Sequence, residues 1–229
     1  MHSPKRVVIC GKGELAIFAC RYFQEHPDYL LSHVVADPFE PVSSEQTLID
    51  YCHQQQIPVV EDGRFENLPG YAEQAFSCDL CLVIFHKRIL PRAFIDCCAK
   101  ILNLHLSYLP HYRGVRPVNW ALKNGERRHG VTLHEINEGI DDGPILSQVA
   151  FDIFPEFEEV GDTYQRAMGY ARQLLSDSLP LIYRITPVPQ DHGQMSIYYE
   201  RDNLRLEERM TFTKAKSLEL LAQSAAKPA

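Results

Sequence analysis

The chain has 229 residues, of which 45% are hydrophobic and 23% are charged, a composition typical of one large globular domain or one domain with a short appendage. Its formal net charge of −7 argues against broad affinity for nucleic acid, because phosphate binding requires clustered lysine and arginine. No apolar run approaches the roughly 20 residues that a membrane span needs, and the apolar run at 7–10 is a poor signal peptide. We therefore expect a cytoplasmic protein that has neither nucleic acid nor a membrane as a partner.

In the first half of the chain, apolar runs alternate with helix-like segments. The predicted strands cover residues 6–10, 30–36, 57–60, 80–85 and 101–105. The predicted helices lie near 14–25, 44–55, 64–76 and 91–98. Strands and helices that alternate in this way indicate an α/β fold, with a mostly parallel sheet covered on both faces.

The pattern changes after residue 105. A helix over 118–124 begins after Pro117, and two strand-like runs at 130–136 and 145–153 flank an acidic loop. A long helix follows, for which Asp162 and Gln165 resemble a capping box. Six of its apolar positions fall on one helical face: Tyr164, Ala167, Met168, Ala171, Leu174 and Leu175. Farther on, 194–199 and 204–211 predict a β-hairpin and 214–223 a short helix. We expect a main domain over 1–185 and an appendage over 186–229.

The seven cysteines are an odd number in a chain too large to depend on disulfides, which favours reduced thiols. Cys78 and Cys81 have the CxxC spacing of metal and redox sites. However, the second cysteine pair, Cys97 and Cys98, is adjacent in sequence and suits a tetrahedral zinc site badly. Core thiols are the favoured interpretation, and we expect no metal.

A glycine-rich turn follows the first predicted strand. Residues 11–16 read GKGELA and fit the GxGxxG/A pattern, and Asp37 ends the next strand, where a dinucleotide-binding fold places its ribose-binding acid. The alternative is structural, because glycines suit any tight strand–helix turn and Glu14 would repel a pyrophosphate. An NAD-dependent oxidoreductase is therefore kept as an alternative from another functional class.

Asn103 and His105 end a predicted strand, and alternation places both side chains on one face. The C-terminal edge of a parallel sheet is the usual ligand crevice. A carboxamide can donate a hydrogen bond to a developing oxyanion, and an imidazole can transfer a proton. A strand end capped by two polar side chains is the alternative, and these two residues alone do not decide between them.

Five spaced elements surround this pair: N-x-H at 103–105, S-x-L-P at 107–110, R-G-x-x-P at 113–117, G-x-T-x-H at 130–134 and I-D-x-G at 140–143. In this order they resemble the folate-dependent formyltransferase superfamily, which includes the glycinamide ribonucleotide, methionyl-tRNA and sugar N-formyltransferases. The resemblance spans roughly residues 5–185. It implies a Rossmann-like, mostly parallel sheet with helices on both faces, followed by a small C-terminal β-hairpin and helix, and N10-formyltetrahydrofolate as the formyl donor.

The resemblance also assigns roles. The catalytic trio matches Asn103, His105 and Asp141. Asp142 is an alternative carboxylate, but the family's acid is followed by one residue and then glycine, which selects Asp141. The pterin pocket matches Phe85, Lys87, Arg88, Ile89 and Leu90, with Ile140 and Asp141 closing its other side. His134 matches a recurrent family histidine, with a packed strand histidine as the alternative.

The segment from Tyr112 to Ala121 looks most like that of the sugar N-formyltransferases. This implies a nucleotide-linked amino sugar as the acceptor, such as a dTDP-4-amino-4,6-dideoxyhexose of lipopolysaccharide O-antigen biosynthesis. The candidate substrate contacts are Tyr112, Arg113, Arg116, Trp120, Lys123 and His134, although solvated surface charges and a core tryptophan are the alternatives.

The tail after 185 is too short for the RNA-binding domain of the methionyl-tRNA enzyme, and in the sugar group such a tail often builds a dimer. The resemblance therefore implies a homodimer. A formyltetrahydrofolate hydrolase, in which water replaces the amine, and a catalytically idle binding module are kept as further alternatives.

Overall fold

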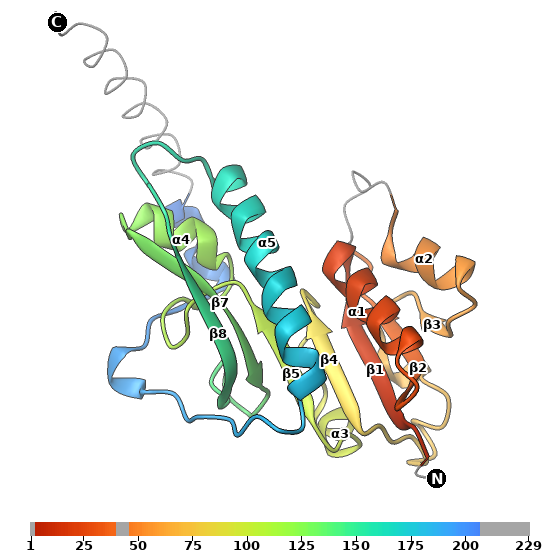
Figure 1. The fold of residues 1–229 in the computed structure, drawn as a ribbon. Helices are drawn as coiled ribbons and strands as arrows, with labels where there is room; N and C mark the ends of the chain where they lie inside the picture. The colour runs from red at the N-terminus through yellow and green to blue at the C-terminus, as the bar shows by residue number, and fades with distance from the viewer. Residues whose placement is uncertain (1–2, 40–45, 207–229) are drawn as a thin grey trace, which may run out of the picture. The chain divides into compact units, whose positions relative to one another are not determined.

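The computed structural model describes residues 3–39 and 46–206. The strands of the main sheet follow the order β3-β2-β1-β4-β5-β7-β8 (Figure 1). The described residues fall into two compact units. One contains the residues up to His105 together with His134–Ile136, and the other contains Leu106–Leu133 and the residues after Ile136. The predicted α/β class with a mostly parallel sheet is confirmed.

The first unit is a parallel sheet with helices. Its strands are β1 (Lys5–Gly11), β2 (Tyr29–Ala36), β3 (Val59–Val60), β4 (Leu80–Ile84) and β5 (Ile101–His105). Each neighbouring pair among them runs parallel. Its helices are α1 (Gly13–Glu25), α2 (Leu48–Gln54) and α3 (Arg92–Asp96), and α1 lies against β1 and β2 (Figure 1). All carboxyl ends of the five strands therefore meet at one edge.

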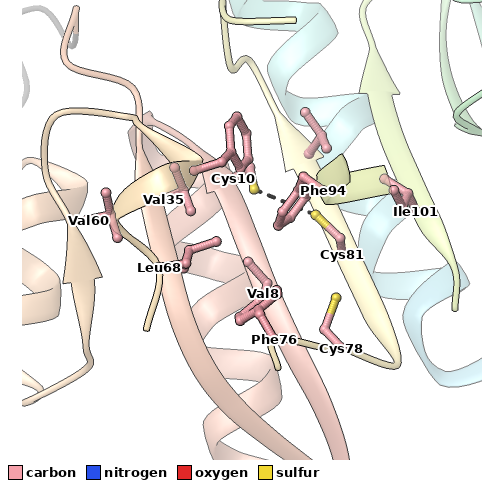
Figure 2. Packing of buried hydrophobic residues seen from close by; sticks show 12 residues of the cluster. Val8, Cys10, Val35, Val60, Leu68, Phe76, Cys78, Cys81, Phe94 and Ile101 are labelled. Atoms are coloured by element: carbon pink, nitrogen blue, oxygen red, sulfur yellow. Dashed lines mark hydrogen bonds between the residues drawn. The ribbon is translucent and has the colours of Figure 1, made fainter. Parts of the chain in front are cut away.

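The core of this unit follows from strand alternation. Val8 and Cys10 of β1 point to one face, where they join a cluster that includes Phe94 of α3 and three further aromatic and aliphatic side chains: Phe65, Leu68 and Phe76 (Figure 2). Val7 and Ile9 point to the opposite face and are fully buried as well. Both faces of the sheet are thus covered.

The cysteines belong to this core. Cys10 and Cys81 bring their sulfurs to 3.6 Å inside the cluster (Figure 2), and Cys78 donates a thiol hydrogen bond to Cys98 at 2.9 Å. Burial and the neighbouring thiol raise the pKa of Cys81. Within residues 3–39 and 46–206, no group of three metal-binding side chains is arranged to hold an ion.

The helix predicted over 64–76 is wrong. Only the 3-10 turn η1 (Phe65–Asn67) forms, and Leu68 already has an extended ψ of 131°. The physical reason is Pro69, because the residue before a proline is pushed out of the helical region. Gly70 then turns the chain with a φ of +80°.

The second unit combines strands and two helices. Its strands are β6 (Arg113–Gly114), most of β7 (Arg128–Glu135), β8 (Ile145–Asp152) and β9 (Ile197–Tyr198). Its helices are α4 (Pro117–Lys123) and α5 (Val160–Ser178), with the 3-10 turns η2 (Leu179–Leu181), η3 (His192–Gln194) and η4 (Glu200–Asn203). Helix α5 contacts α4 and β8. No helix in the described part of the chain is long and apolar enough to cross a membrane.

Helix α5 confirms the predicted apolar face but not the predicted cap. Five of the six predicted positions are buried, and Tyr164 is exposed. The capping box is formed by Glu159 and Asp162, whose carboxylate accepts the Glu159 amide at 2.9 Å. Asp162 therefore closes the box from inside the helix, three residues after the true cap.

The predicted C-terminal hairpin is wrong in its described part. β9 pairs in parallel with β6 instead of with the segment that follows it, because Ser196 and Tyr198 accept hydrogen bonds from Arg113 and Val115. Residues 200–206 are helical turns. The helix predicted over 214–223 lies outside the described residues, and the boundary near 185 stays a prediction.

Candidate active site

Asn103 and His105 lie at the carboxyl end of β5. Their side chains share one face of the strand, whereas Leu102 and Leu104 point to the other face and are buried. His105 is itself buried, with 7% of its surface exposed, and Asn103 is half-buried. The strand therefore presents a carboxamide and an imidazole together, as the N-x-H pattern predicts.

His134 of β7 is bonded to Asn103. The Asn103 Nδ2 atom lies 3.1 Å from Nε2 of His134, and Nδ1 of His134 lies 2.8 Å from the backbone oxygen of Glu135. Because an amide nitrogen donates and a carbonyl oxygen accepts, Nε2 of His134 is placed to accept from Asn103 and Nδ1 to donate to Glu135. The ring is 1% exposed and stands edge-on to His105. The ring of His134 is thus bonded to Asn103, and its contact with a substrate stays a prediction.

The segment predicted to face a pterin follows β4. The backbone amide of Lys87 donates to Asp37 at 2.6 Å, which anchors the start of the segment. Phe85 has a φ of +59°, an unusual conformation for an aromatic residue, and Leu90 is half-buried. Ile89 exposes 91% of its surface, and the neighbouring Arg88 is exposed as well. The segment is thus anchored at Lys87 and exposed at Arg88 and Ile89. Its contact with a ligand stays a prediction.

No sequence pattern singled out His86, which lies in the same segment. Its ring stands edge-on to Phe65, and neither ring nitrogen has a hydrogen-bond partner among residues 3–39 and 46–206. Burial lowers the pKa of His86 to about 4, although the charge of Asp37 acts in the opposite direction. The ring is therefore neutral at pH 7, with two nitrogens that a ligand or water can satisfy.

The glycine-rich turn has a structural purpose. A Cβ atom on Gly11 would lie 1.9 Å from the backbone oxygen of Ile84, so only glycine lets the ends of β1 and β4 approach so closely. Asp37 is fully buried and accepts backbone hydrogen bonds from Phe39 and Lys87. Burial opposes its charge, but these bonds and the Lys12 ammonium at 3.3 Å outweigh that effect and lower the pKa of Asp37. This acid is not available to a ribose, which removes the main support for NAD.

In the second unit, the two neighbouring acids have different partners. Asp141 has a φ of +47°, and its carboxylate accepts the backbone amide of Gly114 at 2.8 Å. Asp142 instead pairs with the guanidinium of Arg113 at 2.5 Å and lies 3.3 Å from Nδ1 of His192. Asp142 is thus engaged with a buried cation, and the choice of Asp141 as the catalytic acid stays a prediction.

Arg113 does not have the predicted role of binding a diphosphate. Its side chain is 3% exposed, and besides Asp142 it donates to Oε1 of Gln190 through Nε at 3.2 Å and Nη2 at 2.7 Å. The arginine therefore holds the loops of this unit together. Arg116 is exposed at the start of α4, with a φ of +53°, and stays a candidate for an anionic group.

Tyr112 and Trp120 are packed side chains. Tyr198 of β9 stacks on both rings, at 4.1 Å from Trp120 and 5.8 Å from Tyr112. The Tyr112 hydroxyl donates to Glu126 at 2.5 Å, and burial together with this acid raises the pKa of Tyr112. The predicted stacking of these two residues on a base or sugar is corrected, because the C-terminal segment occupies their faces. Lys123 lies over the Trp120 ring at 5.0 Å.

The predicted site residues divide between the two units. The first unit brings together Asn103, His105 and His134 and also holds the segment from Phe85 to Leu90. Asp141 belongs to the second unit, as does Ile140, whose side chain is exposed. The approach of Asp141 to His105 stays a prediction.

Comparison with known proteins gives these residues a context. Residues 43–179 match the model of the formyl transferase family. A methionyl-tRNA formyltransferase of Fervidobacterium nodosum is 36% identical over 196 residues, which is 82% of this chain and 61% of that protein. The chain thus spans about three fifths of the length of this relative.

Two solved structures share the fold. An N-formyltransferase of Helicobacter canadensis, in complex with folinic acid and dTDP-3-aminofucose, has a TM-score of 0.72 and 25% identity, over 86% of this chain and 71% of that one. A sugar N-formyltransferase of a Shewanella species has a TM-score of 0.62 and 20% identity, over 86% and 78% of the two chains, and shows the fold alone. The family match covers more than half of the sequence, and the chain therefore belongs to the formyl transferase family.

Proposed function

We propose that this protein transfers the formyl group of N10-formyltetrahydrofolate to the amine of a nucleotide-linked amino sugar. The observation that carries the proposal is the oriented carboxamide of Asn103 beside the imidazole of His105, at the end of a strand in a chain of the formyl transferase family. The two groups match the two needs of acyl transfer to an amine, which are an oxyanion donor and a proton carrier.

In the proposed reaction the amine attacks the formyl carbon, and the formyl oxygen becomes an oxyanion. Asn103 donates to that oxygen. Its bond to His134 holds the amide plane in one direction, so the donor needs little reorganisation during the reaction. Preorganisation of this kind is the main reason that such donors accelerate acyl transfer.

His105 moves the protons. The attacking amine becomes cationic and loses a proton, while the leaving nitrogen of the folate gains one, and an imidazole can both accept and donate a proton. The role proposed for Asp141 is to orient this imidazole, directly or through a water.

The proposed donor site uses the segment from Phe85 to Leu90, and the family resemblance adds Ile140 and Asp141. Exposed Ile89 offers an apolar surface to a ring, and Lys87 and Arg88 offer cations to a carboxylate tail. A folate carries both features. The neighbour from Helicobacter canadensis was solved with folinic acid, which supports a folate-type donor.

For the acceptor, the same neighbour supports a dTDP-linked amino sugar, and the net charge of −7 is unfavourable for binding a long polyanion. Methionyl-tRNA is the second candidate, because a curated relative of that name shares 36% identity. Exposed Arg116 is the proposed partner for the sugar diphosphate, in place of the buried Arg113.

One experiment separates these candidates. The purified protein is incubated with N10-formyltetrahydrofolate and, in turn, with dTDP-3-amino and dTDP-4-amino sugars, a UDP-4-amino sugar and methionyl-tRNA, and each acceptor is analysed by mass spectrometry. We expect a formylated dTDP-sugar. Formylated methionyl-tRNA would select the second candidate, and formate release without any amine would indicate the hydrolase.

Two controls test the assignment. The His105→Asn variant should lose turnover with its fold intact, and near-normal rates would reject the proposed site. A folate, but not NAD, should raise the melting temperature, because a ligand that binds only the native state stabilises it. Dimerisation through the region after 185 is part of the proposal, and light scattering of the purified protein tests it.

A further inference from the structure

The segment that follows α5 returns to the loop that carries Asp141. Val188 forms a two-way backbone bridge with Ile145, with distances of 2.7 and 2.8 Å. This bridge fixes the register of the segment and brings Gln190 beside the loop. Gln190 lies beyond residue 179, where the match to the family model ends. The loop that carries Asp141 therefore contacts a segment that the family model does not match.

The Gln190 amide is fully used. Its Nε2 atom donates to the backbone oxygens of Asp141 at 2.9 Å and Gly143 at 2.7 Å. Its Oε1 atom accepts two bonds from Arg113, at 3.2 and 2.7 Å. An amide has two donor hydrogens and two acceptor lone pairs, so every one is satisfied. The side chain is 6% exposed, and buried networks of this kind rigidify the groups that they join.

This network attaches to the loop at Asp141 and at the two residues that follow it. Gln190 holds the carbonyls before and after Asp142, while Arg113 holds the Asp142 carboxylate at 2.5 Å. Asp141, which has a φ of +47°, is thus held at its backbone oxygen by Gln190, and its carboxylate accepts a bond from the amide of Gly114. A non-glycine residue in the left-handed region is kept there only when its surroundings determine its backbone.

We infer that Gln190 is a positioning residue, which fixes the backbone of Asp141 so that its carboxylate keeps one direction during formyl transfer. The inference rests on the proposed function for its catalytic meaning. The hydrogen bonds by which Gln190 holds the backbone oxygens of Asp141 and Gly143 form a clamp on the loop, and this clamp is measurable without any substrate. A glutamate at this position would place acceptor oxygens against two carbonyl oxygens, so the position demands an amide.

The test compares Gln190→Met with Gln190→Glu and with a control, Gln148→Met. Gln148 also donates through Nε2 to a backbone oxygen of this unit, that of Leu109 at 2.8 Å, but no bond joins it to residues 139–143 among those described. Both glutamine variants at 190 should speed amide hydrogen exchange over residues 139–146 by at least about tenfold, whereas the control should leave this exchange unchanged. Unchanged exchange in both variants would overturn the clamp.

The catalytic part is tested by a double-mutant cycle with N10-formyltetrahydrofolate and the dTDP-amino sugar that the wild type formylates. Gln190→Met should lower kcat by about ten- to hundredfold, leave KM for the sugar nearly unchanged and shift the pH–rate profile. In an Asp141→Asn background the same change should have little further effect, because the group to be positioned is gone. Multiplicative effects would overturn the positioning role. A wild type without any formyl transfer would overturn the proposed function, while the exchange result would still decide the clamp.

Discussion

The roles proposed for Asn103 and Asp141 both require a polar side chain that is held in one direction. The two units meet this requirement differently. Asn103 stands on β5, whose ladder of hydrogen bonds fixes its backbone, and the ring of His134 is enough to orient its amide. Asp141 stands on a loop with a positive φ, and its position depends on Gly114 and on Gln190, 49 residues further along the chain.

The difference shows what secondary structure contributes to a site. A strand supplies the backbone geometry, so a single partner suffices, whereas a loop needs attachments brought by distant segments. Loss of a support should therefore cost more at Asp141 than at Asn103, although loss of Asn103 itself should have the largest effect.

Asn103→Ala tests the oxyanion role. Without the amide donor, kcat for formyl transfer should fall by about 100- to 1000-fold, as expected when one oxyanion-hole donor is removed. Steady-state kinetics measure the loss, and urea unfolding should show an intact protein. Asn67→Ala is the control, since Asn67 is an exposed asparagine of the same unit whose amide donates to Asp62 at 2.8 Å. A kcat within threefold of wild type would remove Asn103 from the mechanism.

The two neighbouring acids give the next largest contrast. Asp141→Asn should lower kcat by about 100-fold, in the range of a general acid–base contribution, with little loss of stability. Asp142→Asn should instead lower the free energy of unfolding by roughly 1–3 kcal/mol, because buried Arg113 loses its charged partner. Kinetics and urea unfolding of both variants decide the matter. The opposite pattern would transfer the catalytic role to Asp142.

His86 offers a test by pH, because its ring is buried without a described protein partner whereas His134 is paired. The folded-state pKa of about 4 lies below the ordinary 6.5, so between these values the unfolded chain binds a proton that the native chain does not. Stability contributed by the neutral ring is complete above pH 6.5 and falls as the pH drops, by about 2 kcal/mol between pH 7 and 5.

Urea unfolding of wild type and His86→Asn across this range measures the effect as a difference. The loss on acidification should be smaller in the variant. His53→Asn is the control, since His53 is an exposed histidine paired with Glu61 at 2.9 Å. Equal pH dependence in wild type and His86→Asn would show that the ring of His86 is protonated with an ordinary pKa.

The smallest effect is expected from the support of Asn103. His134→Phe removes the acceptor of the Asn103 amide but leaves β5 in place, so kcat should fall by only about tenfold, less than for Gln190→Met. His129→Phe is the matched control, because this buried histidine of β7 is bonded to the backbone oxygen of Leu106 at 2.8 Å. The control should keep its kcat, and full activity of His134→Phe would show that the orienting role of His134 is wrong.

Much of the fold was predictable because its signals are local. Alternating apolar runs identified β1, β4 and β5, and the 3.6-residue period identified α5. The failures also have local causes. Pro69 prevents the helix predicted over 64–76. The cap of α5 lies at Glu159 instead of Asp162, and the sequence pattern does not separate these two acids, which are three residues apart. The spacing of Asn103 and His105 was enough to place both on one strand face.

By itself, the sequence determined the family, the parallel sheet and the residues that compete for the catalytic roles, because these depend on spacing along single strands and turns. Only the tertiary structure decided which of them hold the protein together. Asp37, Arg113 and Trp120 are polar or aromatic residues of the kinds that sites use, and each is buried by a partner far away in the chain. The same long-range contacts place Gln190 beside Asp141, since burial and hydrogen bonding depend on neighbours in space that no local spacing records.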